Sequence, residues 1–293
     1  MRLVQKPAEL ADAVIATSGL AAKAFGDGTV YLERFISRTR HVEVQIFGFG
    51  DGTAVHLYER DCSLQRRHQK VIEEARAPDI PEDVLQRMCT AAIDLANHCK
   101  YKGAGTIEFL YDTESGSFYF LEMNTRIQVE HPVTEMITGI DLVGCQLRLA
   151  MGHSLGGALA QSEIKASGHA VEARVYAEDP GRDFIPRPGL ISKLAFPAMD
   201  NVRVETGYQT GSEVTPFYDP MIMKVIAWDR DRIQAIDRLC RALAEIELTG
   251  ITSNLAYLRA ILQQRDFRAG RIHTHLLPEK HVDLISHGRG PTS

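Results

Sequence analysis

Alternating apolar and polar residues in the first half of the chain predict antiparallel β-strands. Between residues 42 and 46, three apolar residues alternate with Glu43 and Gln45, which is the two-residue period of a half-buried strand. Glycines flank Asp51 in a turn signal, so residues 54–58 should return as the partner strand of a hairpin. By the same criteria, further strands are expected over residues 30–36, 106–111, 118–123 and 169–176.

Stripes of apolar residues with the period of an α-helix recur between these strands. They predict helices over residues 7–24, from Pro81 to a stop near Gly103, over 132–149, over 233–246, and from an N-cap at Thr252. Residues 153–167 read as a connector, 180–189 as a loop rich in proline and glycine, and the last dozen residues as a frayed end. The combined pattern predicts an α+β fold with a largely antiparallel sheet.

The amino-acid composition argues against several classes of protein. The chain of 293 residues has 33 basic and 38 acidic residues and a net charge of −5, which argues against nucleic-acid binding. No run of about 18 apolar residues is present, so neither a transmembrane helix nor a membrane partner is expected. The five cysteines form neither a zinc-type spacing nor an even-numbered disulfide framework. We therefore expect a globular protein of the reducing cytoplasm.

Two glutamates mark the predicted hairpin of residues 106–123 as a candidate metal site. If its turn is centred on Ser115, Glu108 and Glu122 lie directly opposite each other, and like charges in that position destabilise a sheet unless a cation lies between them. Asn124 projects from the same face. Two carboxylates and an amide oxygen suit Mg²⁺ or Mn²⁺, usually shared with phosphate oxygens. The alternative is a shifted register with two solvated surface glutamates.

Polar residues continue at alternate positions after this hairpin. In an extended chain, Arg126, Gln128 and Glu130 would lie on the same side as Glu122 and Asn124. Five consecutive polar groups on one side indicate the lining of a site. Clustered titratable groups also occur in structural networks, so the pattern leaves both interpretations open.

Residues 122–135, Glu-Met-Asn-Thr-Arg-Ile-Gln-Val-Glu-His-Pro-Val-Thr-Glu, closely resemble the signature of biotin carboxylases, which are ATP-grasp enzymes. The resemblance extends from Met1 to about His281. Its other segments are Arg40–Gln45, Glu59–Lys70, Gly168–Arg174, Pro216–Met221 and Gly250–Asn254. Such long ordered motifs are far more specific than a single glycine-rich match.

The resemblance implies an ATP-grasp large domain with an antiparallel sheet, joined to a biotin carboxylase C-terminal domain. Residues 1–35 would be a remnant of the ATP-grasp lid, 36–152 the ATP-grasp C-terminal lobe, 153–281 the biotin carboxylase C-terminal region and 282–293 a tail. Family members begin with a further domain and a glycine-rich loop whose amides hold phosphates. We expect this chain to be truncated at the N-terminus, lacking both, and therefore inactive alone.

The resemblance also implies a reaction, in which ATP phosphorylates bicarbonate and the resulting carboxyphosphate delivers CO₂ to N1′ of biotin. Glu130 matches the general base, and Arg174 matches the residue that binds biotin and stabilises its enolate. Lys70, Arg126, Gln128 and the backbone of Val129 match the bicarbonate pocket, where a planar guanidinium suits a planar anion. Lys70 and Arg126 would therefore join Glu130 and Arg174 as catalytic residues.

The nucleotide and metal contacts follow from the same resemblance. Glu33 matches the contact to the adenine amino group, Phe35 and Ile36 supply backbone and apolar wall, His41, Gln65 and His68 approach the ribose and phosphates, and Leu110 packs under the base. Glu108, Glu122 and Asn124 would bridge Mg²⁺ (or Mn²⁺) to the phosphates. Judged alone, the run Arg66–Lys70 is a solvated basic loop, His41 a structural histidine and Arg174 half of a salt bridge.

The sequence is compatible with three functions. The first is the C-terminal part of a biotin carboxylase that works with a biotin carboxyl carrier domain and a carboxyltransferase, with a homodimer suggested by the family. The second is a non-catalytic module for dimerisation or for docking the biotinyl carrier. The third is another ATP-grasp ligase, such as a carbamoyl-phosphate or purine-pathway enzyme, which the Arg174 motif disfavours. The final acceptor (acetyl-CoA, propionyl-CoA, methylcrotonyl-CoA, pyruvate or urea) is chosen by the carboxyltransferase.

Overall fold

The computed structural model describes residues 2–155 and 159–288, and the chain divides into two compact units, Met1–Ser37 and Arg38–Ser293. In the first unit, the short 3-10 helix η1 (Pro7–Glu9) leads into α1 (Leu10–Phe25), which confirms the predicted helix. Gly26 ends α1 in the left-handed conformation, φ 76°, which only glycine adopts readily. The strand predicted over residues 30–36 is wrong, because the described part of this unit offers no second strand with which it could pair.

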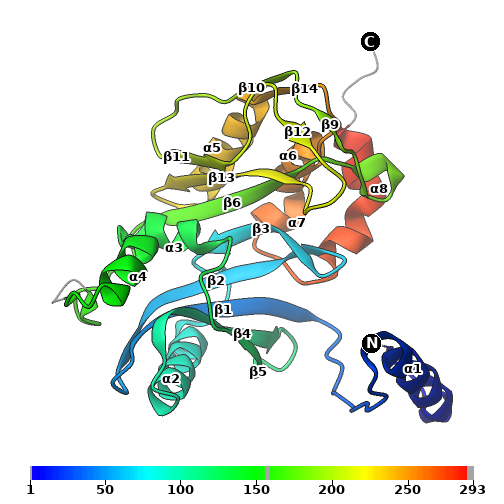
Figure 1. Cartoon of the computed structure of the whole chain (residues 1–293), viewed down its shortest axis with the longest axis vertical. Helices are drawn as coiled ribbons and strands as arrows, with labels where there is room; N and C mark the ends of the chain where they lie inside the picture. Colours follow the sequence, from blue (N-terminus) through cyan, green and yellow to red (C-terminus); the bar gives the residue numbers. More distant parts are fainter. Residues whose placement is uncertain (1, 156–158, 289–293) are drawn as a thin grey trace. The chain divides into compact units, whose positions relative to one another are not determined.

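The second unit is built on one eight-stranded sheet in which every neighbouring pair is antiparallel (Figure 1). The order across the sheet is β11-β13-β6-β3-β2-β1-β4-β5. Its strands are β1 (Thr39–Phe49), β2 (Ala54–Arg66), β3 (Gln69–Ala75), β4 (Lys102–Asp112), β5 (Phe118–Asn124), β6 (His169–Tyr176), β11 (Val202–Thr206) and β13 (Met221–Asp229). The predicted α+β class and the two predicted hairpins are therefore confirmed.

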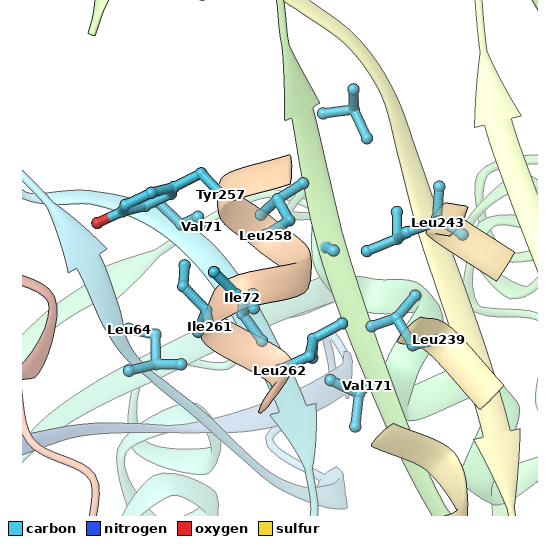
Figure 2. Close-up of a cluster of buried hydrophobic side chains, with 14 of the residues drawn as sticks. Leu64, Val71, Ile72, Val171, Leu239, Leu243, Tyr257, Leu258, Ile261 and Leu262 are labelled. Atoms are coloured by element: carbon cyan, nitrogen blue, oxygen red, sulfur yellow. The ribbon is translucent and has the colours of Figure 1, made fainter. Parts of the chain in front are cut away.

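Amphipathic helices cover one face of this sheet with their apolar sides. Helix α2 (Glu82–His98) packs its buried stripe on the even-numbered residues Val42, Val44 and Ile46 of β1. Helices α5 (Arg232–Glu245) and α6 (Leu255–Gln263) cover β6 and β13 in the same way. Figure 2 shows Leu258, Ile261 and Leu262 of α6 beside Val71 and Ile72 of β3. Burial of this kind contributes about 25 cal/mol per Å² of apolar area.

The opposite face carries α3 (His131–Thr138) and α4 (Leu142–Ala150). Helix α3 packs on Ala75, Ala170 and Ile226, and α4 packs near Phe47 and Leu57. Because side chains alternate across a strand, this face also receives Thr39, His41, Glu43 and Gln45 of β1, which are polar. It is the face on which the predicted site residues gather.

Several predicted boundaries are wrong. The single helix expected over 132–149 is two helices, because Gly139 takes φ 72° and ends α3, and Asp141 caps α4 through Gly144 N. Helix α2 ends at His98, and Gly103 lies instead inside β4. The N-cap of α6 is Asn254 rather than Thr252.

The remaining elements are short, except for the last helix. They are β7 (Glu178–Asp179), η3 (Pro180–Arg182), β8 (Ile185–Pro186), β9 (Gly189–Leu190), β10 (Lys193–Ala195), β12 (Glu213–Val214), β14 (Glu247–Thr249), α7 (Arg265–Arg268) and α8 (Leu276–Gly288). Residues 282–288 of the tail expected to fray thus belong to α8, and 289–293 lie outside the described residues. Among the helices of the described ranges, none is long and apolar enough to cross a membrane.

Candidate active site

Strand β1 is buried on both faces, which corrects the half-buried prediction. Glu43 and Gln45 have no exposed surface. Their partner is Arg60 of β2, whose Nε lies 2.6 Å from Glu43 Oε1 and whose Nη1 donates to Gln45 Oε1 at 2.7 Å. A buried carboxylate needs such compensation, since an uncompensated charge is costly in the interior.

Arg60 links the strands and the helix that surround the site. Its guanidinium, which is fully buried, also donates to Thr106 on β4, to Thr134 on α3 and to the side-chain oxygen of Gln128. One side chain thus ties two further strands and a helix to β2. Arg60 belongs to the segment Glu59–Lys70 that resembles the family, but the resemblance implied no role for it. The local signal was its position between Glu59 and Asp61, in the polar run that follows the predicted strand of residues 54–58.

Lys70 of β3 lies among three carboxylates. Its Nζ is 2.6 Å from Glu43 Oε2, 3.1 Å from Glu108 Oε1 and 2.6 Å from Glu130 Oε1. Burial would lower the pKa of Lys70, but the carboxylates, led by Glu43, raise it well above its usual range. Burial likewise opposes ionisation of Glu43, yet the charges of Lys70 and Arg60 lower its pKa to about 2. Lys70 is therefore a fixed cation at the centre of the site.

The carboxylate hairpin has the predicted register. Glu108 pairs with Glu122 and Thr106 with Asn124, and a bulge follows after Glu108. Asn124 Nδ2 donates to both carboxylates at 3.0 Å. Rotating this amide by half a turn would direct its oxygen to the same point, so the three side chains fit a hard divalent cation.

His41 extends the site along β1. Its Nδ1 is 2.6 Å from Gln65 Nε2, and its Nε2 is 2.7 Å from Glu108 Oε2. Burial would raise the pKa of Glu108, but the contact with His41 and the charges of His41 and Lys70 lower it to about 2. Leu110 lies directly opposite His41 in the β1–β4 pairing. These predicted residues therefore share one face of the sheet.

Glu130 receives two cations. One carboxylate oxygen contacts Lys70, and Oε2 accepts a hydrogen bond from Arg174 Nη2 at 2.9 Å. Only 2% of the Glu130 surface is exposed. The preceding residue is also held from β13, because Lys224 Nζ donates to the carbonyl of Val129 at 2.5 Å. The same ammonium group forms an ion pair with Glu205 at 2.8 Å.

Other predicted residues are not brought into this network by any contact that the structure shows. Arg126 is exposed and donates to the carbonyl of Ile127, and His68 is exposed in the turn between β2 and β3. Strand β5 ends at Asn124, so the predicted extended alternation to Glu130 is wrong. Glu33, Phe35 and Ile36 belong to the first unit, and their nucleotide contacts stay predictions.

Two family models match the chain. Residues 1–158 match the carbamoyl-phosphate synthase L chain, ATP binding domain. Residues 172–279 match the biotin carboxylase C-terminal domain, and they include Arg174. The chain belongs to the biotin carboxylase family. The predicted combination of ATP-grasp and biotin carboxylase C-terminal domains is thereby confirmed, and the bounds of the four predicted segments stay predictions.

Relatives of this biotin carboxylase chain belong to larger carboxylases. It is 47% identical to the alpha subunit of mitochondrial methylcrotonoyl-CoA carboxylase from Mus musculus, over 97% of this chain and 40% of that protein. It is 47% identical to a pyruvate carboxylase subunit of Methanothermobacter thermautotrophicus, over 95% of this chain and 56% of that protein. The chain thus spans about half the length of these relatives.

A solved structure of the same family agrees in fold. The biotin carboxylase domain dimer of Hydrogenobacter thermophilus 2-oxoglutarate carboxylase, in complex with MgADP, ADP and bicarbonate, gives a TM-score of 0.90 at 39% identity. The match covers 97% of this chain and 62% of that one.

Proposed function

We propose that this chain supplies the bicarbonate-activating half of a biotin carboxylase site. The observation that carries the proposal is the convergence of Lys70 and Arg174 on the buried carboxylate of Glu130. In the reaction, a bicarbonate oxygen attacks the γ-phosphorus of ATP, giving carboxyphosphate and ADP. Carboxyphosphate then breaks into CO₂ and phosphate, and CO₂ joins N1′ of biotin as the released phosphate takes the proton of that nitrogen.

Glu130 is proposed as the general base. Its charge is stabilised by Lys70 at 2.6 Å and Arg174 at 2.9 Å. A bicarbonate entering between these cations would draw them onto its own oxygens. Glu130 would then lose stabilisation and become a better acceptor for the bicarbonate proton. Gln128, the backbone of Val129 and Arg126 would complete the anion pocket.

Arg174 is proposed to serve the second half-reaction. A fixed guanidinium beside the ureido oxygen of biotin would stabilise the negative charge that develops there, in the manner of an oxyanion hole. Charge stabilisation of this kind is strongest in a site that excludes water, and Glu130, the hydrogen-bond partner of Arg174, is buried. Arg174 would therefore act in both half-reactions, first on bicarbonate and then on the ureido oxygen of biotin.

The hairpin residues Glu108, Glu122 and Asn124 are proposed to hold Mg²⁺, and Mn²⁺ suits the same oxygen donors. The ion, when bound, neutralises charge on the ATP phosphates. Support comes from the hard-ligand chemistry of the three side chains and from the MgADP bound by the similar 2-oxoglutarate carboxylase domain. His41, Gln65 and Leu110 of the sheet, with His68, Glu33, Phe35 and Ile36, would bind the nucleotide.

Biotin would arrive on a carrier domain, and a carboxyltransferase would consume the carboxybiotin. The relatives are subunits of methylcrotonoyl-CoA and pyruvate carboxylases. The final carboxyl acceptor is therefore proposed to be selected by the partner carboxyltransferase and not by this site. A homodimer is proposed from the dimer named for the similar domain. The cysteines of the described residues are free thiols, which suits the proposed cytoplasmic location.

The test is bicarbonate-dependent ATP hydrolysis with free biotin. It would be measured on this chain and on a fusion that adds the preceding segment of a biotin carboxylase relative. Activity of the fusion, with little in the chain by itself, is the expected result. A fusion that binds MgATP but hydrolyses it at the same rate with and without bicarbonate would contradict the proposal and favour a non-catalytic docking or dimerisation module.

A further inference from the structure

Two glutamates lie buried side by side next to the proposed site. Glu73 of β3 and Glu172 of β6 are directly opposite each other in the antiparallel ladder, on the face that carries α3. Neither has any exposed surface. Directly opposed residues of a ladder have Cβ atoms about 4.5–5.5 Å apart, so two carboxylate charges here would repel strongly in a medium that screens poorly.

The charged and titratable groups that face this pair do not balance two negative charges. They come from every element around it: Lys70 on β3, Arg174 and Tyr176 on β6, Cys62 on β2, Lys224 on β13, and Glu130 before α3. Lys70 contacts Glu43, Glu108 and Glu130, and Lys224 contacts Glu205 and Val129.

Arg174 is the cation that contacts Glu73. Its Nη2 forms an ion pair with Glu73 Oε1 at 2.5 Å and also donates to Glu130 Oε2 at 2.9 Å. Both oxygens of Glu172 are buried and make no hydrogen bond to a described residue. Arg174 is therefore shared between Glu73 and Glu130, and Glu172 has no ion-pair partner among the described residues.

Electrostatics agree with this geometry. Burial raises the pKa of Glu73 to about 7, against the opposing charge of Arg174. Burial, and then repulsion from Glu73, raise the pKa of Glu172 well above its usual range. A buried carboxyl without a full counter-charge takes up a proton and becomes neutral.

We propose that Glu73 and Glu172 together retain a proton in the folded protein and act as a positioning pair for Arg174. Glu73 fixes the guanidinium at the distance that reaches Glu130. The retained proton limits the negative charge beside Arg174, so its positive charge stays available to an incoming anion. Loss of the proton at higher pH would draw Arg174 toward the pair and repel bicarbonate. The consequence for bicarbonate rests on the proposed function, whereas the proton itself does not.

The proton can be measured on the chain without any ligand. The infrared carbonyl stretch of a protonated carboxylic acid should be present at neutral pH and should decrease as pH rises. Glu172→Gln mimics the neutral acid and should remove that part of the band which titrates with the pair. Glu163→Gln, at an exposed glutamate, is the matched control and should leave the band unchanged.

The environment of Arg174 is measured separately, through the ¹⁵N resonance of its side chain. This resonance is assigned by its absence from the spectrum of Arg174→Lys. In the wild type this resonance should move with the same midpoint as the infrared band, and in Glu172→Gln the movement should disappear. If Glu172→Gln does not fold, coincidence of the two midpoints in the wild type still decides the matter.

Absence of a protonated-acid band at neutral pH would overturn the proposal, whatever the protein does with bicarbonate. A band that titrates while the Arg174 resonance stays fixed would overturn the positioning role. If band and resonance titrate together but ¹³C-bicarbonate does not bind, the pair stands as inferred and the proposed function fails. The two ideas can therefore fail independently.

Discussion

Lys70 Nζ lies 2.6 Å from Glu130 Oε1, although sixty residues separate the two along the chain. The contact joins strand β3 to the loop that precedes helix α3. It places a cation beside the carboxylate on which the proposed chemistry depends. The same Nζ contacts Glu43 and Glu108, so its loss would leave three carboxylates short of a counter-charge.

Lys70→Met should destabilise the fold as well as the site. Removing one partner of a buried ion pair costs about 3–5 kcal/mol, because the remaining charge stays in the interior. Urea unfolding at neutral pH would measure the loss. Lys193→Met is the matched control, since Lys193 forms an exposed pair with Glu247, and such pairs contribute roughly 0–1 kcal/mol. Equal losses in the two variants would show that Lys70 is not a structural cation.

The folded protein should lose stability in acid because the carboxylate of Glu74 becomes protonated. Its carboxylate is bound by Arg232 at 2.6 Å and by His169 at 2.7 Å. Burial opposes ionisation, but these partners lower the pKa of Glu74 to about 2 from 4.5. The unfolded state therefore binds more protons between those values. The stabilisation is present above pH 4.5 and is lost as pH falls toward 2.

The measurement is the free energy of unfolding across this pH window for the wild type and Glu74→Gln. The shift corresponds to about 3 kcal/mol by order of magnitude, at about 1.4 kcal/mol per pH unit. The variant should be less stable at neutral pH and should lose less on acidification. Glu163→Gln should follow the wild-type curve. A Glu74→Gln curve parallel to that of the wild type would argue against this source of acid sensitivity.

Glu122→Gln should weaken cation binding without unfolding the chain. Glu122 is exposed, and its carboxylate is one of the proposed ligands. A tenfold weaker Mn²⁺ affinity, about 1.4 kcal/mol, is expected from loss of one charged ligand. Titration of Mn²⁺ alone, followed by electron paramagnetic resonance, measures it. Glu114→Gln, in the turn of the same hairpin, is the control and should bind as the wild type does. An unchanged affinity in Glu122→Gln would exclude it as a ligand.

Lys224→Met should affect bicarbonate more than ATP. Its Nζ holds the carbonyl of Val129, next to the proposed base. Release of this carbonyl should raise the KM for bicarbonate of the completed fusion by about tenfold and leave the KM for ATP near its wild-type value. Lys193→Met again serves as control. A rise of both KM values together would indicate general damage to the fold.

Local patterns were sufficient for much of the fold. The period-two alternation identified β1, and the short turn at Ser115 placed Glu108 opposite Glu122, because both depend on residues close in sequence. The alternation could not show that Glu43 and Gln45 are buried, since their partner Arg60 lies on another strand and the covering α3 is far along the chain.

The errors have the same origin. Residues 30–36 have the composition of a strand, but a strand also needs a neighbour. The apolar stripe over 132–149 is continuous across Gly139, so it does not indicate that this residue takes a positive φ. That conformation divides the predicted helix into α3 and α4. Two further relationships join segments that are distant in sequence, and local patterns therefore do not predict them. They are the pairing of Glu73 with Glu172 and the contact of Lys224 with Val129.

The most direct test of the central claim is bicarbonate-dependent ATP hydrolysis by the completed fusion and its Glu130→Gln variant. A general base contributes about 10²–10⁴-fold, so Glu130→Gln should lower the bicarbonate-dependent rate by at least about 100-fold while MgATP still binds. The bicarbonate-independent rate should change little. Hydrolysis by Glu130→Gln at a rate near that of the wild type would contradict the role of Glu130 and the account built on it.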